Sequence, residues 1–238
     1  MVMSQNMANL THPFIRLGMC LPMAPQLFQL EEGASLSMGL QSENFYPLIS
    51  SVDVQLCKVG SIDPKKAKGK ILFCHLRELD ELVYAGQAAL STGAVGLILA
   101  NNKQRRHDIV PFAHLLPTSH INYTDGEYVY SYIKGSKTPK VYMTRAKTLL
   151  GVKPAPIVSL LSSRRPNPIQ PAILKPDIIA PCVDILYAFT EAISPTGFAS
   201  DNRWIPYNIG SGTSVSCPHV SGIIGLLKTL FQIGVLQL

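Results

Sequence analysis

The chain has 238 residues, enough to bury the core of one large domain or two small ones. Hydrophobic residues make up 47% and charged residues 15% of the sequence, a balance that excludes a disordered tail and a coiled coil. The 21 lysines and arginines exceed the 15 acidic residues, but they are spread along the chain without the interleaved aromatics of a nucleic-acid platform. We therefore expect a packed globular protein with no nucleic-acid partner.

Two apolar stretches have some features of membrane or targeting segments. Residues 220–238 have the length of a membrane span, but Lys228, Gln232 and Gln237 interrupt them, so we expect a buried helix. Residues 17–28 contain two prolines and follow no short basic start, which argues against a signal peptide. The sequence thus predicts neither a membrane partner nor a signal peptide.

Residues 1–52 carry little periodic signal, because glycine, proline and serine break them into short strand and loop pieces. The pattern becomes clearer after residue 68. Its spacing predicts a buried strand, a helix and a second strand, over residues 70–74, 79–90 and 94–100. This succession is typical of the strand, crossover helix, strand unit of a parallel sheet.

More elements of the same kind follow. Residues 118–121 are a candidate strand. Residues 124–127, Thr-Asp-Gly-Glu, have the spacing of a capping box, which predicts a helix that begins there and ends at Gly135. Residues 140–149 alternate enough for a returning strand, and the two prolines of residues 151–156 predict a linker and a domain boundary.

Beyond the linker the sequence again alternates between apolar runs and turns. Three runs are candidates for buried strands, at residues 157–162, 177–180 and 183–189. A polar loop over residues 194–203 leads to a further strand at residues 204–209. A last helix begins near Ser214, and its apolar side holds Ile223, Leu226, Leu227, Leu230 and Phe231. The alternation of strands and helices indicates an α/β protein.

The cysteines and sequons leave several alternatives open. The five cysteines show no Cys-x-x-Cys spacing, so we expect neither a zinc site nor thioredoxin-like chemistry. Cys57 and Cys74 flank a lysine-rich loop and either form a disulfide or remain two buried thiols. Asn9 and Asn122 each begin an Asn-x-Thr triplet, which permits glycosylation of a secreted chain but also arises by chance.

Residues 210–222, Gly-Ser-Gly-Thr-Ser-Val-Ser-Cys-Pro-His-Val-Ser-Gly, point to a chemical site. Ser214 follows Gly212 and Thr213 at the predicted start of a helix, where the dipole and free N–H groups favour negative charge. Glycine lets a substrate backbone approach, and the Ser214 N–H is placed to donate to an oxyanion. For an isolated Gly-Thr-Ser, the alternative is a serine that merely caps a buried helix.

The eleven residues 212–222 closely resemble the nucleophile signature of the subtilisin-like serine proteases, with Val215 where methionine is commoner. Residues 162–168, 173–181 and 183–186 resemble the segments that lead to this serine in the plant members, and residues 64–145 resemble their protease-associated insert. The resemblance implies a partial subtilisin-like parallel-sheet domain with an inserted protease-associated α+β domain. Residues 1–52 would then be an irregular N-terminal remnant of the catalytic domain, 53–150 the insert and 151–238 the part that bears the serine.

The resemblance also implies a function. Ser214 would be the nucleophile and a backbone oxyanion donor, and Gly212 and Thr213 would form the supporting turn. The substrate would be a polypeptide, no cofactor would be needed, and the location would be extracellular, in the apoplast or cell wall. The insert would be a candidate surface for a homodimer.

The chain also departs from the family pattern. The motifs of the catalytic aspartate, the catalytic histidine and the oxyanion asparagine precede the insert in that family, and this sequence contains none of them. His219 is five residues from Ser214, which on a helix turns it about 140° away. Arg165 and Cys182 replace glycines, and each would strain the backbone if its φ were positive. We expect little activity from this chain alone, and a non-catalytic binding or self-association module and a truncated gene product remain the alternatives.

Overall fold

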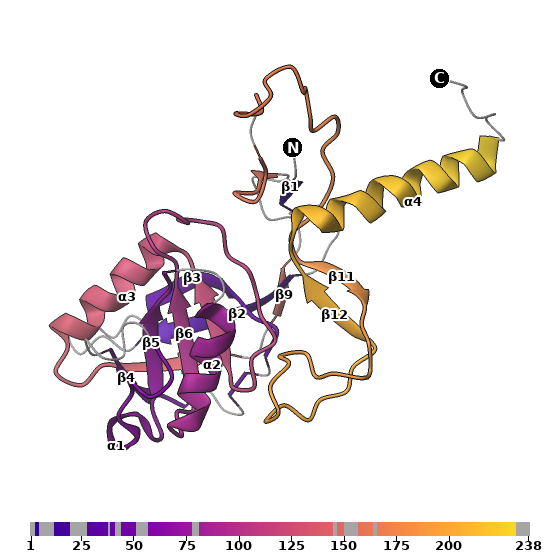
Figure 1. Cartoon of the computed structure of the whole chain (residues 1–238). Helices are drawn as coiled ribbons and strands as arrows, with labels where there is room; N and C mark the ends of the chain where they lie inside the picture. Colours follow the sequence, from indigo (N-terminus) through magenta and orange to yellow (C-terminus); the bar gives the residue numbers. More distant parts are fainter. Residues whose placement is uncertain are drawn as a thin grey trace. The chain divides into compact units, whose positions relative to one another are not determined.

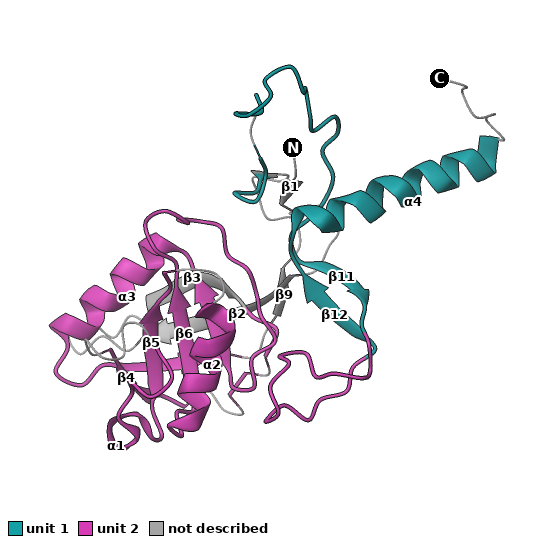
Figure 2. Ribbon diagram, viewed as in Figure 1, with its two compact units in different colours: residues 1–10, 150–189, 206–238 teal, residues 11–149, 190–205 magenta. Residues whose placement is uncertain are grey.

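The chain folds into two compact units (Figure 2). The computed structural model describes residues 3–4, 12–19, 28–37, 39–40, 44–50, 57–77, 81–144, 147–149, 157–163 and 166–231. Unit 1 comprises residues 1–10, 150–189 and 206–238, and unit 2 comprises residues 11–149 and 190–205. The predicted boundary at residue 150 lies within one residue of a boundary between these units, whereas the one at residue 52 lies inside unit 2. As boundaries of folding domains, both stay predictions.

Unit 2 is built on one eight-stranded mixed sheet (Figure 1). Its strands are β2 (His12–Met19), β3 (Phe28–Ala34), β4 (Tyr46–Ile49), β5 (Ile71–His75), β6 (Gly96–Ala100), β7 (Thr118–Ile121), β8 (Lys140–Met143) and β9 (Lys147–Leu149). They lie in the order β3-β7-β6-β5-β4-β8-β2-β9, and an additional pairing of β2 with β3 curls the sheet back on itself. The ladders from β4 through β5 and β6 to β7 are parallel, as expected for strand–helix–strand units.

Helices cover both faces of the parallel strands, which is why the central strands β5 and β6 are almost entirely apolar. Successive side chains of a strand point to opposite faces. Leu72 and Cys74 of β5 therefore join the core cluster that contains residues of α2 (Glu81–Ser91). Ile71 and Phe73 join a second cluster, which contains residues of α3 (Tyr123–Gly135). Residues 97–100 of β6 are divided between the two clusters in the same way.

The strands and helices predicted within residues 70–135 are confirmed, with one correction to the start of the second helix. The single strand predicted at residues 140–149 is instead two strands, β8 and β9. A short helix, α1 (Pro64–Ala67), precedes β5. The capping box predicted at residues 124–127 is wrong, because α3 begins at Tyr123 and its cap is Asn122. The Asn122 side chain accepts a hydrogen bond from the Asp125 N–H at 2.9 Å and donates one to the Asp125 carboxylate at 2.7 Å. Asparagine caps as well as threonine does, so the earlier of two competent residues begins the helix.

Unit 1 has little regular structure besides one helix. Strand β1 (Met3–Ser4) pairs with β10 (Ile157–Val158), and β11 (Ile185–Ala188) pairs antiparallel with β12 (Tyr207–Gly210). The prediction of buried strands is therefore only partly correct. Residues 177–180 form no strand, and Leu186 and Tyr187 of β11 are exposed.

The last helix, α4 (Thr213–Phe231), begins one residue before its predicted start at Ser214. The expectation of burial is wrong for residues 221–231 of this helix, all of which are exposed. All five residues of the predicted apolar side are exposed, from 44% at Leu227 to 73% at Leu230. The described core of unit 1 is small, with Cys182, Val183 and Leu161 as its members, and cannot cover this surface. None of the described helices combines the length and apolar character that a membrane span requires.

Candidate functional site

Ser214 is the second residue of α4 and its side chain is exposed. Two backbone hydrogen bonds fix the turn that precedes it. The Gly212 N–H donates to the Cys182 carbonyl at 2.8 Å, and the Val215 N–H donates to the Gly212 carbonyl at 3.0 Å. The chain therefore passes from β12 into the helix through a turn that presents the serine at the surface.

A second contact, which sequence reasoning missed, fixes the same turn. The Ser211 hydroxyl accepts a hydrogen bond from the Asp184 N–H at 2.9 Å and donates one to the Asp184 carboxylate at 3.2 Å. Asp184 has φ +56°, a left-handed conformation that aspartate adopts more readily than most residues. The two residues are 27 positions apart, so no local pattern signals their contact.

The start of α4 favours negative charge. Its first turn holds no acidic residue, so no side-chain carboxylate there offsets the positive end of the helix dipole. Space is open beside Gly212, where an added Cβ would meet no atom closer than Val215 Cγ2 at 4.0 Å. The surroundings of Ser214 therefore combine an exposed hydroxyl, a helix N-terminus and room for an approaching backbone. These are the features that an acyl-transfer nucleophile requires.

No described histidine of unit 1 is placed to act as a base for Ser214. The single histidine within that unit is His219, and its Nδ1 lies 3.2 Å from the Val215 carbonyl, to which it donates along the helix. Of the two aspartates in this unit, Asp184 bonds to Ser211 and Asp177 forms an ion pair with Lys175. Each of these three side chains therefore has a partner other than Ser214.

His114 and His120 of unit 2 are buried, and burial lowers the pKa of each. Burial lowers the pKa of His114 to about 3, with smaller contributions from His120 and Arg203. Burial also lowers the pKa of His120 to about 4, although its hydrogen bond to Val110 opposes the shift. Both imidazoles are therefore neutral in the folded protein at pH 7.

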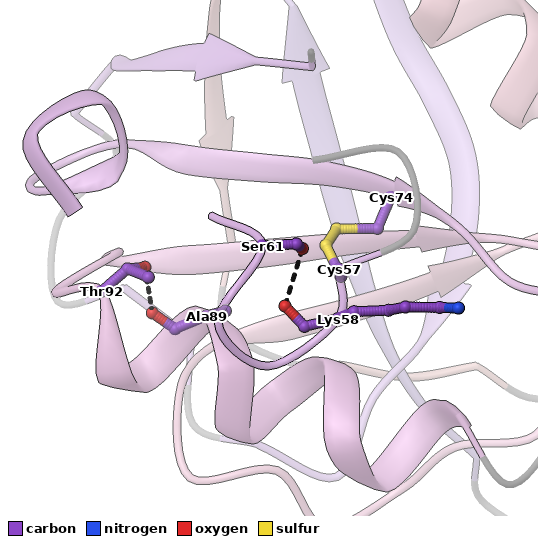
Figure 3. The surroundings of a disulfide bond; sticks show 6 residues. All are labelled: Cys57, Lys58, Ser61, Cys74, Ala89 and Thr92. Atoms are coloured by element: carbon purple, nitrogen blue, oxygen red, sulfur yellow. Dashed lines mark hydrogen bonds between the residues drawn. A yellow bond between two sulfur atoms is a disulfide. The ribbon is translucent and has the colours of Figure 1, made fainter. Parts of the chain in front are cut away.

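Cys57 and Cys74 are joined by a disulfide, with their Cα atoms 5.9 Å apart (Figure 3). The bond ties the segment before α1 to β5. Two nearby hydrogen bonds close turns in the same region, from the Ser61 hydroxyl to the Lys58 carbonyl at 2.7 Å and from the Thr92 hydroxyl to the Ala89 carbonyl at 2.8 Å. Among the described residues, the buried Cys182 and the exposed Cys217 form no disulfide.

The remaining predicted positions are placed as follows. Asn122 caps α3, while Asn9 and Arg165 lie outside the described residues. Cys182 does not have a positive φ and is fully buried, so the strain predicted for it is not found. No group of three or more metal-ligating side chains occurs in the described part of the chain.

Comparisons with known proteins agree with the resemblance seen in the sequence. A family model described as PA domain matches residues 44–129. The chain is 50% identical over 209 residues to the subtilisin-like protease SBT5.4 of Arabidopsis thaliana, a match that covers 84% of this chain and 27% of that protein. It is 43% identical to SBT5.3 of the same plant over 211 residues, with the same coverage.

A third relative comes from another plant. The subtilisin-like protease Glyma18g48580 of Glycine max is 40% identical over 225 residues, which cover 84% of this chain and 28% of that protein. The chain spans about a quarter of the length of these relatives. Over most of its own length, with the PA domain included, the chain belongs with the plant subtilisin-like proteases.

Proposed function

We propose that this chain carries the nucleophile segment of a serine endopeptidase and that Ser214 attacks peptide bonds of polypeptide substrates. The observation that carries the proposal is the exposed Ser214 hydroxyl at the start of α4, beside the open space at Gly212. Relatives named subtilisin-like proteases support the same reaction class.

The residues have distinct roles in this reaction. The Ser214 oxygen attacks the substrate carbonyl carbon as a base removes its proton, and the carbonyl oxygen becomes an oxyanion. The Ser214 N–H and the helix dipole stabilise that charge. Collapse of the intermediate breaks the C–N bond, the amine leaves with a proton from the conjugate acid of the base, and water then hydrolyses the acyl-enzyme. Since the described residues of unit 1 provide no base, we propose that this chain alone turns over substrate at background rate.

A chimera separates the competence of Ser214 from the lack of a base. Residues 45–230 of this chain replace the matching segment of SBT5.4, and the chimera is assayed with casein and with a fluorophosphonate probe. We expect hydrolysis and labelling, both lost in Ser214→Ala and both retained in Ser221→Ala, an exposed serine of the same helix. A folded chimera that neither labels nor cleaves would overturn the proposal.

We also propose an extracellular location. The disulfide between Cys57 and Cys74 supports it, because disulfides persist in oxidising compartments. Expression with and without a secretory leader tests it. The leaderless chain should accumulate with both thiols reduced, and a disulfide formed equally in a reducing cytosol would contradict the proposal.

A second candidate function rests on unit 2. This unit has two extensive core clusters, whereas the described core of unit 1 is small, so unit 2 is the better-formed module. We propose that it binds polypeptide partners or a second copy of the chain without catalysis. Light scattering on the full chain at increasing concentration tests self-association, and a constant monomer mass at every concentration would exclude a homodimer.

A further inference from the structure

The loop of residues 190–205 lies between β11 and β12 and has ordered internal structure. Beyond the strand ladder, the Phe189 N–H donates to the Pro206 carbonyl at 2.8 Å, which closes the neck of the loop. Within the loop, the buried Asp201 carboxylate accepts hydrogen bonds from the Thr196 hydroxyl at 2.8 Å and the Thr196 N–H at 3.2 Å. A loop with closed ends and internal packing behaves as one body.

Arg203 attaches this loop to the PA-containing unit. Its Nε and one terminal nitrogen each lie 2.8 Å from an oxygen of Asp201. The same guanidinium donates to the backbone carbonyls of Ala113 and His114, at 2.5 Å and 3.3 Å. A planar guanidinium can serve a carboxylate and two carbonyls at once, while an ammonium acts as a single point charge.

Two further contacts hold the loop on helix α2 of the same unit. The Ser200 hydroxyl donates to Gln87 Oε1 at 3.1 Å, and the Phe198 ring meets the Tyr84 ring edge-on at 5.9 Å between centroids. Together with the Arg203 contacts, these attach three points of the loop to unit 2. The carbonyls that Arg203 contacts are 89 and 90 positions away in sequence, and Gln87 is 113 positions away from Ser200. The loop thus belongs structurally to the PA-containing unit although it continues directly into β11 and β12.

We propose that residues 190–205 are a docking arm, and that Arg203 is a positioning residue that holds the β11–β12 ladder and the turn before Ser214. The inference rests on the proposed role of Ser214. The last pair of the ladder, Ile185 with Gly210, is followed directly by Ser211 and Gly212, whose hydrogen bonds fix that turn. Anchoring the far end of a two-stranded ladder opposes its fraying, because an isolated hairpin is only marginally stable in water.

The test uses the full chain and needs no catalysis, so its failure is distinct from failure of the proposed function. Amide hydrogen exchange is followed for residues 207–216 in Arg203→Ala, Arg203→Lys and the wild type. Exchange of residues 196–203 in the same experiment reports whether the arm is docked. Arg77→Ala, at an exposed position outside the arm, is the matched control.

We expect exchange of residues 207–216 in Arg203→Ala to rise about tenfold, with β5 and β6 unchanged. Arg203→Lys should behave similarly because lysine cannot make the forked contact, and Arg77→Ala should match the wild type. Faster exchange of residues 196–203 without faster exchange at residues 207–216 would overturn the inference. If Arg203→Ala unfolds, the milder variants Ser200→Ala and Gln87→Ala are compared with the wild type instead. Exchange of residues 207–216 that is equal in all three chains would overturn the inference.

Discussion

His120 Nε2 lies 2.8 Å from Oδ1 of Asn101, and both side chains are buried. The amide nitrogen of Asn101 donates to the carbonyls of Arg106 and Asp108, so its oxygen faces the imidazole. Nε2 of the neutral ring must then carry the proton and donate. Nδ1 faces the backbone of Val110, 2.8 Å from its carbonyl oxygen and 3.2 Å from its nitrogen. This pair ties the end of β6 to β7 and the loop between them.

Replacement of this imidazole should therefore destabilise unit 2. His120→Leu leaves the Asn101 oxygen buried without its donor, which costs about 1–3 kcal/mol of unfolding free energy. Urea denaturation measures the change. His107→Leu, at an exposed position of the same loop, should stay within about 0.5 kcal/mol of the wild type. Equal losses in the two variants would contradict this account.

The two buried histidines should make the protein less stable in acid. In the unfolded chain both titrate near 6.5, whereas in the folded chain the pKa values are about 3 for His114 and about 4 for His120. The unfolded state therefore binds more protons as the pH falls below about 6.5, and each histidine lowers the unfolding free energy by about 1.4 kcal/mol per pH unit.

The loss should continue until the pH approaches the folded pKa values, and denaturation midpoints between pH 7 and pH 4 measure it. His114→Phe substitutes an aromatic ring that cannot titrate. The unfolding free energy should therefore depend less steeply on pH, by the contribution of one histidine. A slope unchanged by this substitution would show that other groups cause the pH dependence.

Gly126 should not tolerate a larger side chain. A Cβ at this position would lie 2.5 Å from the Cβ of Ala100, where α3 packs on β6. Gly126→Ala should therefore cost about 1–3 kcal/mol by overpacking. Gly135, at the end of the same helix, has open space around it, so Gly135→Ala is the matched control and should be neutral or stabilising. Thermal unfolding of both variants distinguishes the effects.

Removal of the disulfide should also destabilise unit 2. The bond closes a loop with a sequence separation of 17, for which chain entropy predicts about 3 kcal/mol. Cys57→Ser with Cys74→Ser should lose this amount in denaturant, while Cys217→Ser, an exposed thiol, should match the wild type. The same midpoint in oxidised and doubly substituted chains would refute the expectation.

Limited proteolysis tests the predicted domain boundaries. If residues 53–150 fold as a domain, cleavage within residues 151–156 should release a protected fragment that mass spectrometry identifies. The docking arm adds a further expectation, since an intact arm should keep residues 190–205 bound to that fragment under native conditions. Absence of any protected fragment of this extent would mean that the boundary lies elsewhere.

The elements that the sequence predicted best are those whose signal is local. Strands β5 and β6 are continuous apolar runs, and α2 has helical spacing between them, so their neighbours in the chain are also their neighbours in the sheet. The eleven-residue string around Ser214 likewise carries its own signal. Contacts between distant segments were not predictable.

Arg203 shows why. Its backbone acceptors, the carbonyls of Ala113 and His114, are 90 and 89 positions away and leave no trace in side-chain pattern. The predicted burial of α4 failed for a related reason. An apolar helix side indicates that the helix packs against a partner surface, but the sequence does not show whether the described residues of the same chain form that surface.

The alternation of side chains along β5 divides the packing that stabilises unit 2 between two separate core clusters. Leu72 and Phe73 are neighbours in sequence, yet one packs with the residues of α2 and the other with the residues of α3. Substitutions at such positions share no packing partner across the sheet, so their effects on unfolding should add, in contrast to substitutions at Phe73 and Ile98, which lie in one cluster. Sequence variation on one face of this sheet can therefore proceed without compensation on the other.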